Sequence, residues 1–380
     1  MNEYLLTPGP VPTTRDVSLA EARELIGHRG AVFSEFFLNL EEKLSKLLRS
    51  EGRTVIFPSS GTGALESLAA NFTGPDTKVI SVSCGVFGDR FREITAQTGA
   101  RMINIDVEPG SGVRPETVSR AVFEHPGADV LLLTQNETST GVLNPIDEII
   151  AALPKGERPL VLVDGVSSVG AAPCYPEEWG IDGLATASQK GLLTPPGLGL
   201  VWLSERAWDV AAGRKCCSYY FDLVRQRKYI FKDRPENPYT PPVSLYFALD
   251  AALNSVLADG WFEGRRRAAD ALTAGAEALG FKHFVSDKKF RSPGVTALTA
   301  PGGDIQAVIK SLREMGLETA GGQGSLKGKL MRIAHYHDVR WPEISLILGS
   351  LFAASAPLRN ERENFIASAF AVWEGERHER

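Results

Sequence analysis

The 380-residue sequence predicts an α/β protein built on a large, doubly wound, mainly parallel sheet. Short apolar runs without polar interruption alternate with segments whose apolar residues recur at helical spacing, and buried parallel strands joined by helices have this pattern. Polar or small residues follow the ends of several of these runs. In open α/β sheets the ligand binds beyond the carboxyl ends of the strands, so these residues are candidates for one site.

The alternation occupies the first part of the chain. Residues 1–15 are expected to form an extended arm, because their prolines fix φ and remove backbone donors. A helix is expected after Gly30, where apolar residues from Phe33 to Leu47 recur at helical spacing. The expected strands are 54–57, 79–83, 102–105, 130–133, 160–164 and 198–203, and the expected helices between them follow Gly63, begin near 88, cover 115–124 and surround 146–153.

The last third of the chain predicts a smaller α+β domain. Residues 214–234 are charged and aromatic and fit neither pattern, and a helix is expected from about 244 to 257. Beyond it come expected helices at 265–279 and 305–315 and strands at 294–297 and 329–333. The predicted division is an arm (1–15), a large domain (16–257), a small domain (258–356) and a polar tail (357–380).

Composition excludes several classes of function. A net charge of −5 and a pI near 5.8 argue against a nucleic-acid or membrane-surface partner. No apolar run reaches membrane-spanning length and no basic leader opens the chain, so a cytoplasmic location is expected. The four cysteines are predicted to be free thiols, and the six histidines lack metal-ligand spacing, so no metal centre is predicted.

Lys190 stands apart from other charges. The nearest charged residues are Asp182 and Glu205, small residues precede the lysine, and a Pro-Pro-Gly turn follows it at 195–197. Desolvation lowers the pKa of a lysine and makes it usable as a nucleophile or base. The simpler interpretation is a loop lysine whose ammonium group reaches water.

The turn Ser60-Gly61-Thr62 is a candidate anion site, because it follows a strand and opens a helix whose first amides lack partners. A plain helix cap by Ser59 or Ser60 is the alternative. A dinucleotide site is disfavoured, because Glu66 stands where the third glycine of that motif belongs.

These features suit pyridoxal 5′-phosphate (PLP) when they are taken together with Asp164, which ends the strand 160–164. Lys190 would hold the aldehyde as a Schiff base, and the helix after Ser60 would hold the phosphate. An ionised Asp164 would keep the ring nitrogen protonated, which makes the ring an electron sink.

The chain resembles the class V aminotransferases of fold type I, in the group of alanine/serine–glyoxylate aminotransferases. The resemblance runs from about Leu5 to about Ala354 and rests on the motifs Thr7-Pro8-Gly9-Pro10, Ser60-Gly61-Thr62, 137–142 (ETSTGV), 163–168 (VDGVSS), Ser188-Gln189-Lys190 and Arg332-Ile333. It implies a large sheet of the seven-stranded type, a smaller C-terminal α+β domain and a homodimer with the active site at the subunit interface.

The resemblance also implies roles for individual residues. Lys190 would carry the cofactor and then move the proton, and Asp164 would pair with the ring nitrogen. Arg332 would bind the substrate carboxylate, and Gly9 is expected beside the substrate. The implied cofactor-binding residues are Ser60, Gly61, Thr62, Phe87, Thr138, Asp164, Gln189, Lys190 and Thr240, the last reaching the phosphate in the partner subunit.

The sequence departs from the family pattern at three places. Phe87 stands where relatives often have tryptophan, and Asn237 stands where some have a phosphate-binding tyrosine. His335-Tyr336-His337 replaces a common His-Met-Gly after the arginine. The last change is expected to alter the substrate pocket.

The predicted function is amino-group transfer from a small amino acid (alanine or serine) to an α-keto acid (glyoxylate or pyruvate). Variants are 2-aminoethylphosphonate–pyruvate and pyridoxamine–pyruvate transamination. A PLP lyase or desulfurase is disfavoured because no cysteine follows Cys217 to act as a late nucleophile. A non-enzymatic binding protein on the same fold is disfavoured by the intact lysine, aspartate and arginine.

Overall fold

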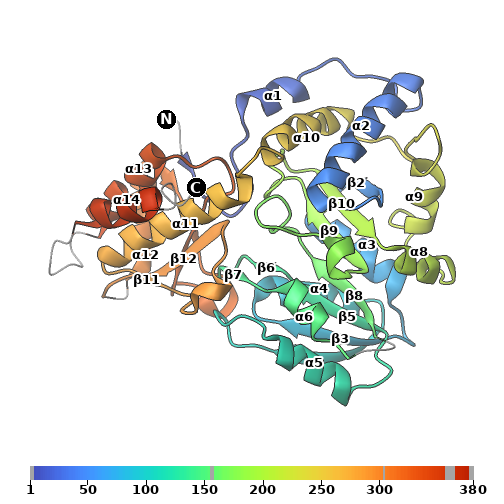
Figure 1. Cartoon of the computed structure of the whole chain (residues 1–380), viewed down its shortest axis with the longest axis horizontal. Coiled ribbons are helices and arrows are strands. Elements are labelled where there is room, and N and C mark those ends of the chain that lie inside the picture. Colours follow the sequence, from blue (N-terminus) through green and yellow to red (C-terminus); the bar gives the residue numbers. More distant parts are fainter. Residues whose placement is uncertain (1–3, 155–157, 303, 356–363, 376–380) are drawn as a thin grey trace.

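A computed structural model describes residues 4–154, 158–302, 304–355 and 364–375. Its centre is a seven-stranded sheet in the order β2-β10-β9-β8-β5-β3-β4, which lies in the larger part of the molecule (Figure 1). The strands are β2 (Thr54–Pro58), β3 (Lys78–Ser83), β4 (Arg101–Asp106), β5 (Val130–Thr134), β8 (Leu160–Asp164), β9 (Gly183–Ala187) and β10 (Leu198–Leu203).

Six strands of this sheet run in one direction. Strand β10 is antiparallel to both of its neighbours, β2 and β9, and the other paired neighbours are parallel. Strands β5 and β8 are fully buried aliphatic runs, as expected for strands covered on both faces. The prediction of a mainly parallel α/β sheet is confirmed. Strand β9 was not predicted, because its small residues (GLATA) lack the branched side chains that mark a strand.

Helices join and cover the strands. Helices α3 and α4 pack on strands β3, β5, β9 and β10, and α10 packs on α1 and α2. The helices of this part are α1 (Arg15–Glu21), α2 (Ala31–Leu48), α3 (Gly61–Phe72), α4 (Val86–Ala96), α5 (Pro115–Glu124), α6 (Ile146–Ala151), α7 (Pro176–Trp179), α8 (Glu205–Ala212), α9 (Leu223–Ile230) and α10 (Val243–Val256). The unassigned region 214–234 contains α9, whose basic composition hid its helical period.

The small domain lies beside the sheet domain and has its own hydrophobic core (Figure 1). Its antiparallel sheet has the order β11-β12-β15-β14. The elements are α11 (Trp261–Ala278), β11 (Lys282–His283), β12 (Val295–Thr299), α12 (Ile305–Glu314), β13 (Leu317–Glu318), β14 (Ala320–Gly321), β15 (Met331–Ala334), α13 (Trp341–Ala354) and α14 (Phe365–Gly375), with short 3₁₀ turns at Lys288–Phe290 and Gly324–Leu326.

The N-terminal arm lies on this small domain. Strand β1 (Tyr4–Leu5) pairs in parallel with β13, and Leu6 is buried in the core of the small domain. The part of the expected arm that the structure describes, residues 4–14, thus connects the small domain to the start of α1, and residues 1–3 of the expected arm lie outside the described residues. A second short pair, β6 (Asn136–Glu137) with β7 (Val142–Leu143), forms the hairpin after β5.

The expectation of a polar tail at 357–380 is wrong for part of that range. Residues 365–375 form α14, which packs against α11, and Ala369 and Trp373 are buried. The apolar sequence FIASAFAVW covers a core, whereas the charged residues around it suggested a solvated tail. The rest of the predicted tail lies outside the described residues.

No helix in the described part of the chain is both long enough and apolar enough to cross a membrane. Cys84, Cys174, Cys216 and Cys217 are all free thiols, and the first two are buried.

Candidate active site

The sheet topology brings the strand-end residues to one edge. Because β2, β3, β5, β8 and β9 run in the same direction, their carboxyl ends lie at the same side of the sheet. The residues that end these strands or follow them are Ser60 after β2, Phe87 after β3, Thr138 after β5, Asp164 at the end of β8 and Lys190 after β9.

Lys190 is held in a tight, buried loop. Ser188 closes the loop by donating from Oγ to the Pro195 carbonyl (2.7 Å) and accepting from the Leu198 amide (3.2 Å). The Lys190 ammonium group donates a hydrogen bond to the Pro8 carbonyl in the N-terminal arm. The pKa of Lys190 is lowered to about 8. The main cause is burial, and the nearby positive charge of Arg332 contributes to the decrease.

Asp164 is fully enclosed at the end of β8. Its Oδ1 accepts a hydrogen bond from the Val166 amide (2.9 Å). Burial raises the pKa of Asp164 to about 7, and the neighbouring carboxylate of Glu137 adds to the rise, while Arg90 and Lys190 oppose it. These mutual charge effects place Asp164, Lys190 and Arg332 in one electrostatic group.

The helix α3 presents its first turn to the same edge. Ser60 caps the helix without a side-chain hydrogen bond, and the first amide to find a partner within the helix is that of Ala64 (3.2 Å to the Ser60 carbonyl). A side chain at position 61 would lie 2.8 Å from Val166 Cγ1, so Gly61 permits the close approach of the helix to the loop after Asp164. The unpaired amides of the first turn and the helix dipole favour negative charge at this end of α3.

Arg332 crosses from the small domain to this edge. It lies on β15, and its Nη1 donates to the Thr138 carbonyl (3.1 Å). Its Nε (3.0 Å) and Nη2 (2.8 Å) both donate to the Gly321 carbonyl. Three hydrogen bonds to two backbone carbonyls thus hold the guanidinium group next to Thr138. The Thr138 Oγ1 atom donates to Ser167 Oγ (2.7 Å).

A buried carboxylate holds the residue expected to stack on the ring. Glu137 accepts from the amides of Phe87 (3.1 Å) and Gly88 (3.0 Å) at the start of α4, and from the Ser139 hydroxyl (2.5 Å). Burial raises the pKa of Glu137, and these hydrogen bonds oppose the rise. Glu137 therefore fixes Phe87 through its backbone.

Arg90 belongs to this group and was missed by the sequence reasoning. Its Cζ lies 4.9 Å from the centre of the Phe87 ring, and its charge acts on both Asp164 and Lys190. The signal in the sequence was its position three residues after Phe87, which places both side chains on one face of α4.

Gln189 and Gly9 flank the lysine. The Gln189 Oε1 atom is buried and has no hydrogen-bond partner among the described residues. Gly9, expected beside the substrate, has a φ of 125°, and a Cβ there would lie 2.6 Å from Lys190 Cε. The arm therefore crosses directly over the lysine side chain, at a position that only glycine fits.

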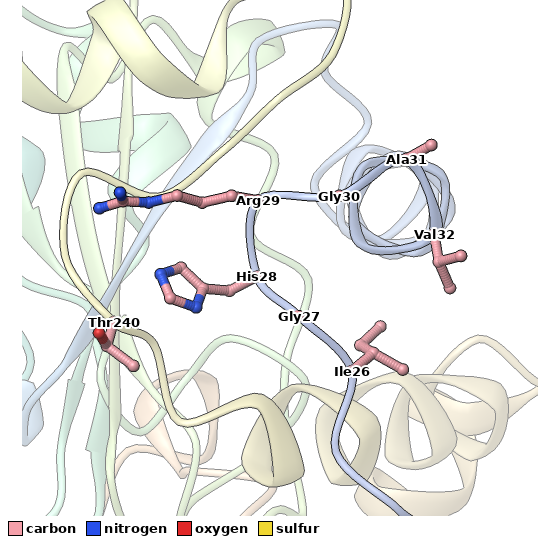
Figure 2. Close-up of a pocket in the computed structure, with 8 residues that line it drawn as sticks. All are labelled: Ile26, Gly27, His28, Arg29, Gly30, Ala31, Val32 and Thr240. Atoms are coloured by element: carbon pink, nitrogen blue, oxygen red, sulfur yellow. The ribbon is translucent and has the colours of Figure 1, made fainter.

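Thr240 does not join this group within the chain. It is exposed and lines a separate hollow of about 720 Å³ together with residues 26–32. Figure 2 shows the His28 and Arg29 side chains extending from the loop before α2 to the side on which Thr240 lies, with His28 between Arg29 and Thr240. The Nε2 atom of His28 is buried and has no partner among the described residues.

The chain is similar to known proteins in both sequence and fold. The model of the family "Aminotransferase class-V" matches residues 16–346. The chain is 35% identical to an uncharacterised aminotransferase of Methanocaldococcus jannaschii, with 88% of each chain covered. It is 33% identical to the small subunit of a soluble hydrogenase of Synechococcus (93% of each) and 31% identical to a serine–glyoxylate aminotransferase of Methylorubrum extorquens (93% of this chain, 90% of the relative).

Two solved structures have closely similar folds. The ureidoglycine–glyoxylate aminotransferase of Bacillus subtilis matches with a TM-score of 0.90 and 28% identity, over 98% of both chains. The pyridoxamine–pyruvate aminotransferase of Mesorhizobium loti matches with a TM-score of 0.91 and 26% identity, over 99% of this chain and 98% of that one.

Proposed function

The chain belongs to the class V aminotransferase family, and we propose that it uses PLP to move an amino group from a small amino acid to glyoxylate or pyruvate. The names of the similar aminotransferases support these two acceptors. The observation that carries the proposal is the grouping of Lys190, with its lowered pKa, with Asp164 and Arg332 at the edge of the sheet.

The residues at this edge fit the chemistry of PLP. The first-turn amides of α3 and the unbonded Ser60 side chain suit a phosphate, with Gly61 and Thr62 in the same turn. The buried, unpartnered oxygen of Gln189 marks a polar group that a ligand can complete. Phe87 and Thr138 follow the neighbouring strands, where the ring and its hydroxyl would lie.

Each side chain would have a distinct task. When bound, PLP supplies an aldehyde that takes up the amino group and a ring that withdraws electrons from the substrate carbon. Lys190, neutral in a substantial fraction near pH 8, would take a proton from the substrate carbon and return it to the cofactor side. Asp164 would hold the ring-nitrogen proton in place, and Arg332 would bind the substrate carboxylate through its remaining N–H groups.

We further propose a homodimer in the cytoplasm, in which Thr240, His28 and Arg29 face the active site of the partner subunit. The support is the separate hollow that these residues line and the exposed apolar side chains near it. Leu25 and Val32, which lie next to or line this hollow, expose 73% and 66% of their surfaces in the single chain and offer apolar surface that a partner subunit can cover.

The amino donor is identified by a half-reaction screen. The purified protein loaded with PLP is mixed singly with alanine, serine, aspartate, pyridoxamine and 2-aminoethylphosphonate, and the loss of the visible absorbance of the lysine-bound cofactor is followed. The proposal expects alanine or serine to react fastest. A fast reaction with pyridoxamine or the phosphonate alone would instead support those transaminases.

The lysine assignment is tested by reduction with borohydride and peptide mass analysis. In the wild-type protein the reduced cofactor is expected on the peptide that contains Lys190, and Lys190→Ala is expected to carry none and to lack transamination. Lys310→Ala, at an exposed position of α12, is the matched control and should retain both. Cofactor on another lysine would contradict the assignment.

A further inference from the structure

Tyr336 is a fully buried tyrosine that the proposed mechanism does not use. It follows β15, the strand of Arg332, by two residues, and none of its surface is exposed. Its ring packs against Gly294, where a Cβ would lie 2.6 Å from Tyr336 Cε1. The ring therefore has one fixed place in the small domain.

The hydroxyl of Tyr336 reaches into the large domain. It lies beside the side chains of Ser167, Thr138 and Asn136, next to the charge of Arg332. It is buried and has no well-directed hydrogen bond to any described residue. An unmade hydrogen bond at a buried hydroxyl is costly, so a small adjustment that completes it is strongly favoured.

Asn136, Thr138 and Ser167 form a hydrogen-bonded cluster, and its bonds limit which atoms can accept a hydrogen bond from the Tyr336 hydroxyl. Ser167 Oγ accepts from Thr138 Oγ1 (2.7 Å) and from Asn136 Nδ2 (2.8 Å), and it donates to the Asn136 carbonyl (2.9 Å). A serine hydroxyl has one donor and two acceptor sites, so Ser167 is saturated. Free acceptor sites remain on Thr138 Oγ1 and on Asn136 Oδ1, which has no partner among the described residues.

Thr138 connects this cluster to Arg332, the proposed carboxylate ligand. Its side chain bonds Ser167, and its carbonyl accepts from Arg332 Nη1 (3.1 Å). Arg332 has five N–H groups and uses three of them in the bonds to Gly321 and Thr138, which leaves one on each Nη. Those two groups form a fork that matches a carboxylate only while the guanidinium keeps its orientation.

We propose that Tyr336 is a positioning residue that sets the specificity of this site for carboxylate-bearing amines. Its hydroxyl completes the cluster of Asn136, Thr138 and Ser167, and the fixed Thr138 carbonyl holds the Arg332 fork toward the substrate. Both Tyr336 and Arg332 come from the small domain, so strand β15 and the residues just after it supply both the carboxylate ligand and the group that orients it. This inference rests on the proposed function for the role of Arg332.

The test removes the hydroxyl and keeps the ring. Tyr336→Phe is expected to raise the KM for alanine about three- to tenfold, the effect of one buried hydrogen bond, with kcat within about twofold of wild type. The half-reaction with ethylamine, which lacks a carboxylate, should be unchanged. On cofactor-free protein, the dissociation constant for propanoate, measured by ligand-observed NMR, should rise by the same factor as the KM.

Tyr246→Phe is the matched control. Tyr246 is the other tyrosine with no exposed surface among the described residues, and its hydroxyl bonds the Ile56 carbonyl (3.3 Å) and Asn237 (3.4 Å) away from the cluster. It should change neither the KM for alanine nor propanoate binding. If Tyr336→Phe does not fold, Ser167→Ala breaks the same hold on Thr138 and should raise both constants.

The proposal is overturned if propanoate binding and the KM for alanine stay at wild-type values in Tyr336→Phe. It is also overturned if the half-reaction with ethylamine slows by the same factor as the half-reaction with alanine. Failure of the proposed function gives a different result, because wild-type protein would then show no transamination with any amine of the panel. The propanoate measurement needs no cofactor and separates the two outcomes.

Discussion

At the scale of single residues, burial brings the pKa values of a lysine and an aspartate, which ordinarily differ widely, close to one another. The pKa of Lys190 falls to about 8 and that of Asp164 rises to about 7, in both cases chiefly because the charged form is desolvated. Without that burial, Lys190 would be almost wholly protonated at neutral pH and a poor base. The enclosed loop after β9 thus lowers the pKa of Lys190 toward the range in which a lysine can act as a base.

The pH dependence of PLP attachment to the cofactor-free protein follows from the pKa of Lys190. Only the neutral amine attacks an aldehyde, so the rate should rise with pH and reach half its maximum near pH 8. An unperturbed lysine would give a midpoint near its ordinary value of about 10.4. Stopped-flow absorbance after mixing with PLP, from pH 6 to 10.5, measures the midpoint, and a value above about 10 would contradict the desolvated lysine.

Asp164→Asn tests the charge beside the ring. Asparagine keeps the size and can still accept from the Val166 amide, but it cannot carry the negative charge. We expect the variant to retain PLP and to lose activity by about 100-fold or more, as when a charge-stabilising group is removed. Cofactor content and kcat are measured on the same preparation. Turnover near the wild-type rate would show that Asp164 does not serve the ring.

At the scale of elements, the termini of helices and strands place the chemistry. Helix α3 directs its unpaired amides at the sheet edge, and the buried Glu137 holds the first turn of α4, so that Phe87 and Arg90 lie on one side. The arm before α1 closes over Lys190 at Gly9. The side chains of the site are thus fixed by backbone that has its own hydrogen bonds, and pre-organisation of this kind is what catalysis requires.

Helix α14 is a structural element with a measurable contribution. Trp373 is 5% exposed, and its ring lies 4.6 Å from Arg267 Cζ on α11. Trp373→Ala is expected to lower the free energy of unfolding by about 3 kcal/mol, the usual cost of emptying a buried aromatic site. Denaturant unfolding is the measurement, with Phe370→Ala, at a position that is 44% exposed, as the milder control. If neither variant lowered the free energy of unfolding measurably, α14 would not cover the core in solution.

At the scale of the whole molecule, the two domains meet through the site. Arg332 and Tyr336 reach from the small domain to Thr138 and its neighbours in the large domain, and the arm connects β13 to Lys190. A movement of the small domain would therefore change the positions of Arg332, Lys190 and Thr138 relative to one another. Thr240 and the loop of His28 and Arg29 lie apart from this group, which is the basis for the proposed dimer.

The dimer is tested by mixing subunits with different defects. Lys190→Ala lacks the lysine of its own site, and Arg29→Ala is expected to damage the site of its partner. In a mixed dimer one of the two sites has both residues intact. When equal amounts mix at random, half of the dimers are mixed, so about a quarter of wild-type activity should return. Each variant alone is the control, and sedimentation gives the oligomeric state. No recovery in a dimeric mixture would mean that Arg29 serves its own subunit.

Six of the seven strands of the large sheet could be predicted from the sequence, because buried parallel strands need continuous apolar runs and the intervening helices need a 3.6-residue period. The sequence also singled out Lys190, Asp164 and Arg332, through isolation, strand-end position and family motifs. Strand β9 and helix α9 were not predicted, since their small or mixed residues carry little local signal. Helix α14 was not predicted because charged residues surround its apolar sequence, and its burial depends on contacts with the distant helix α11. Only the tertiary structure could show that Arg90, Glu137 and Tyr336 join the site, because side-chain burial, pKa and hydrogen-bond partners arise from residues far apart in the chain.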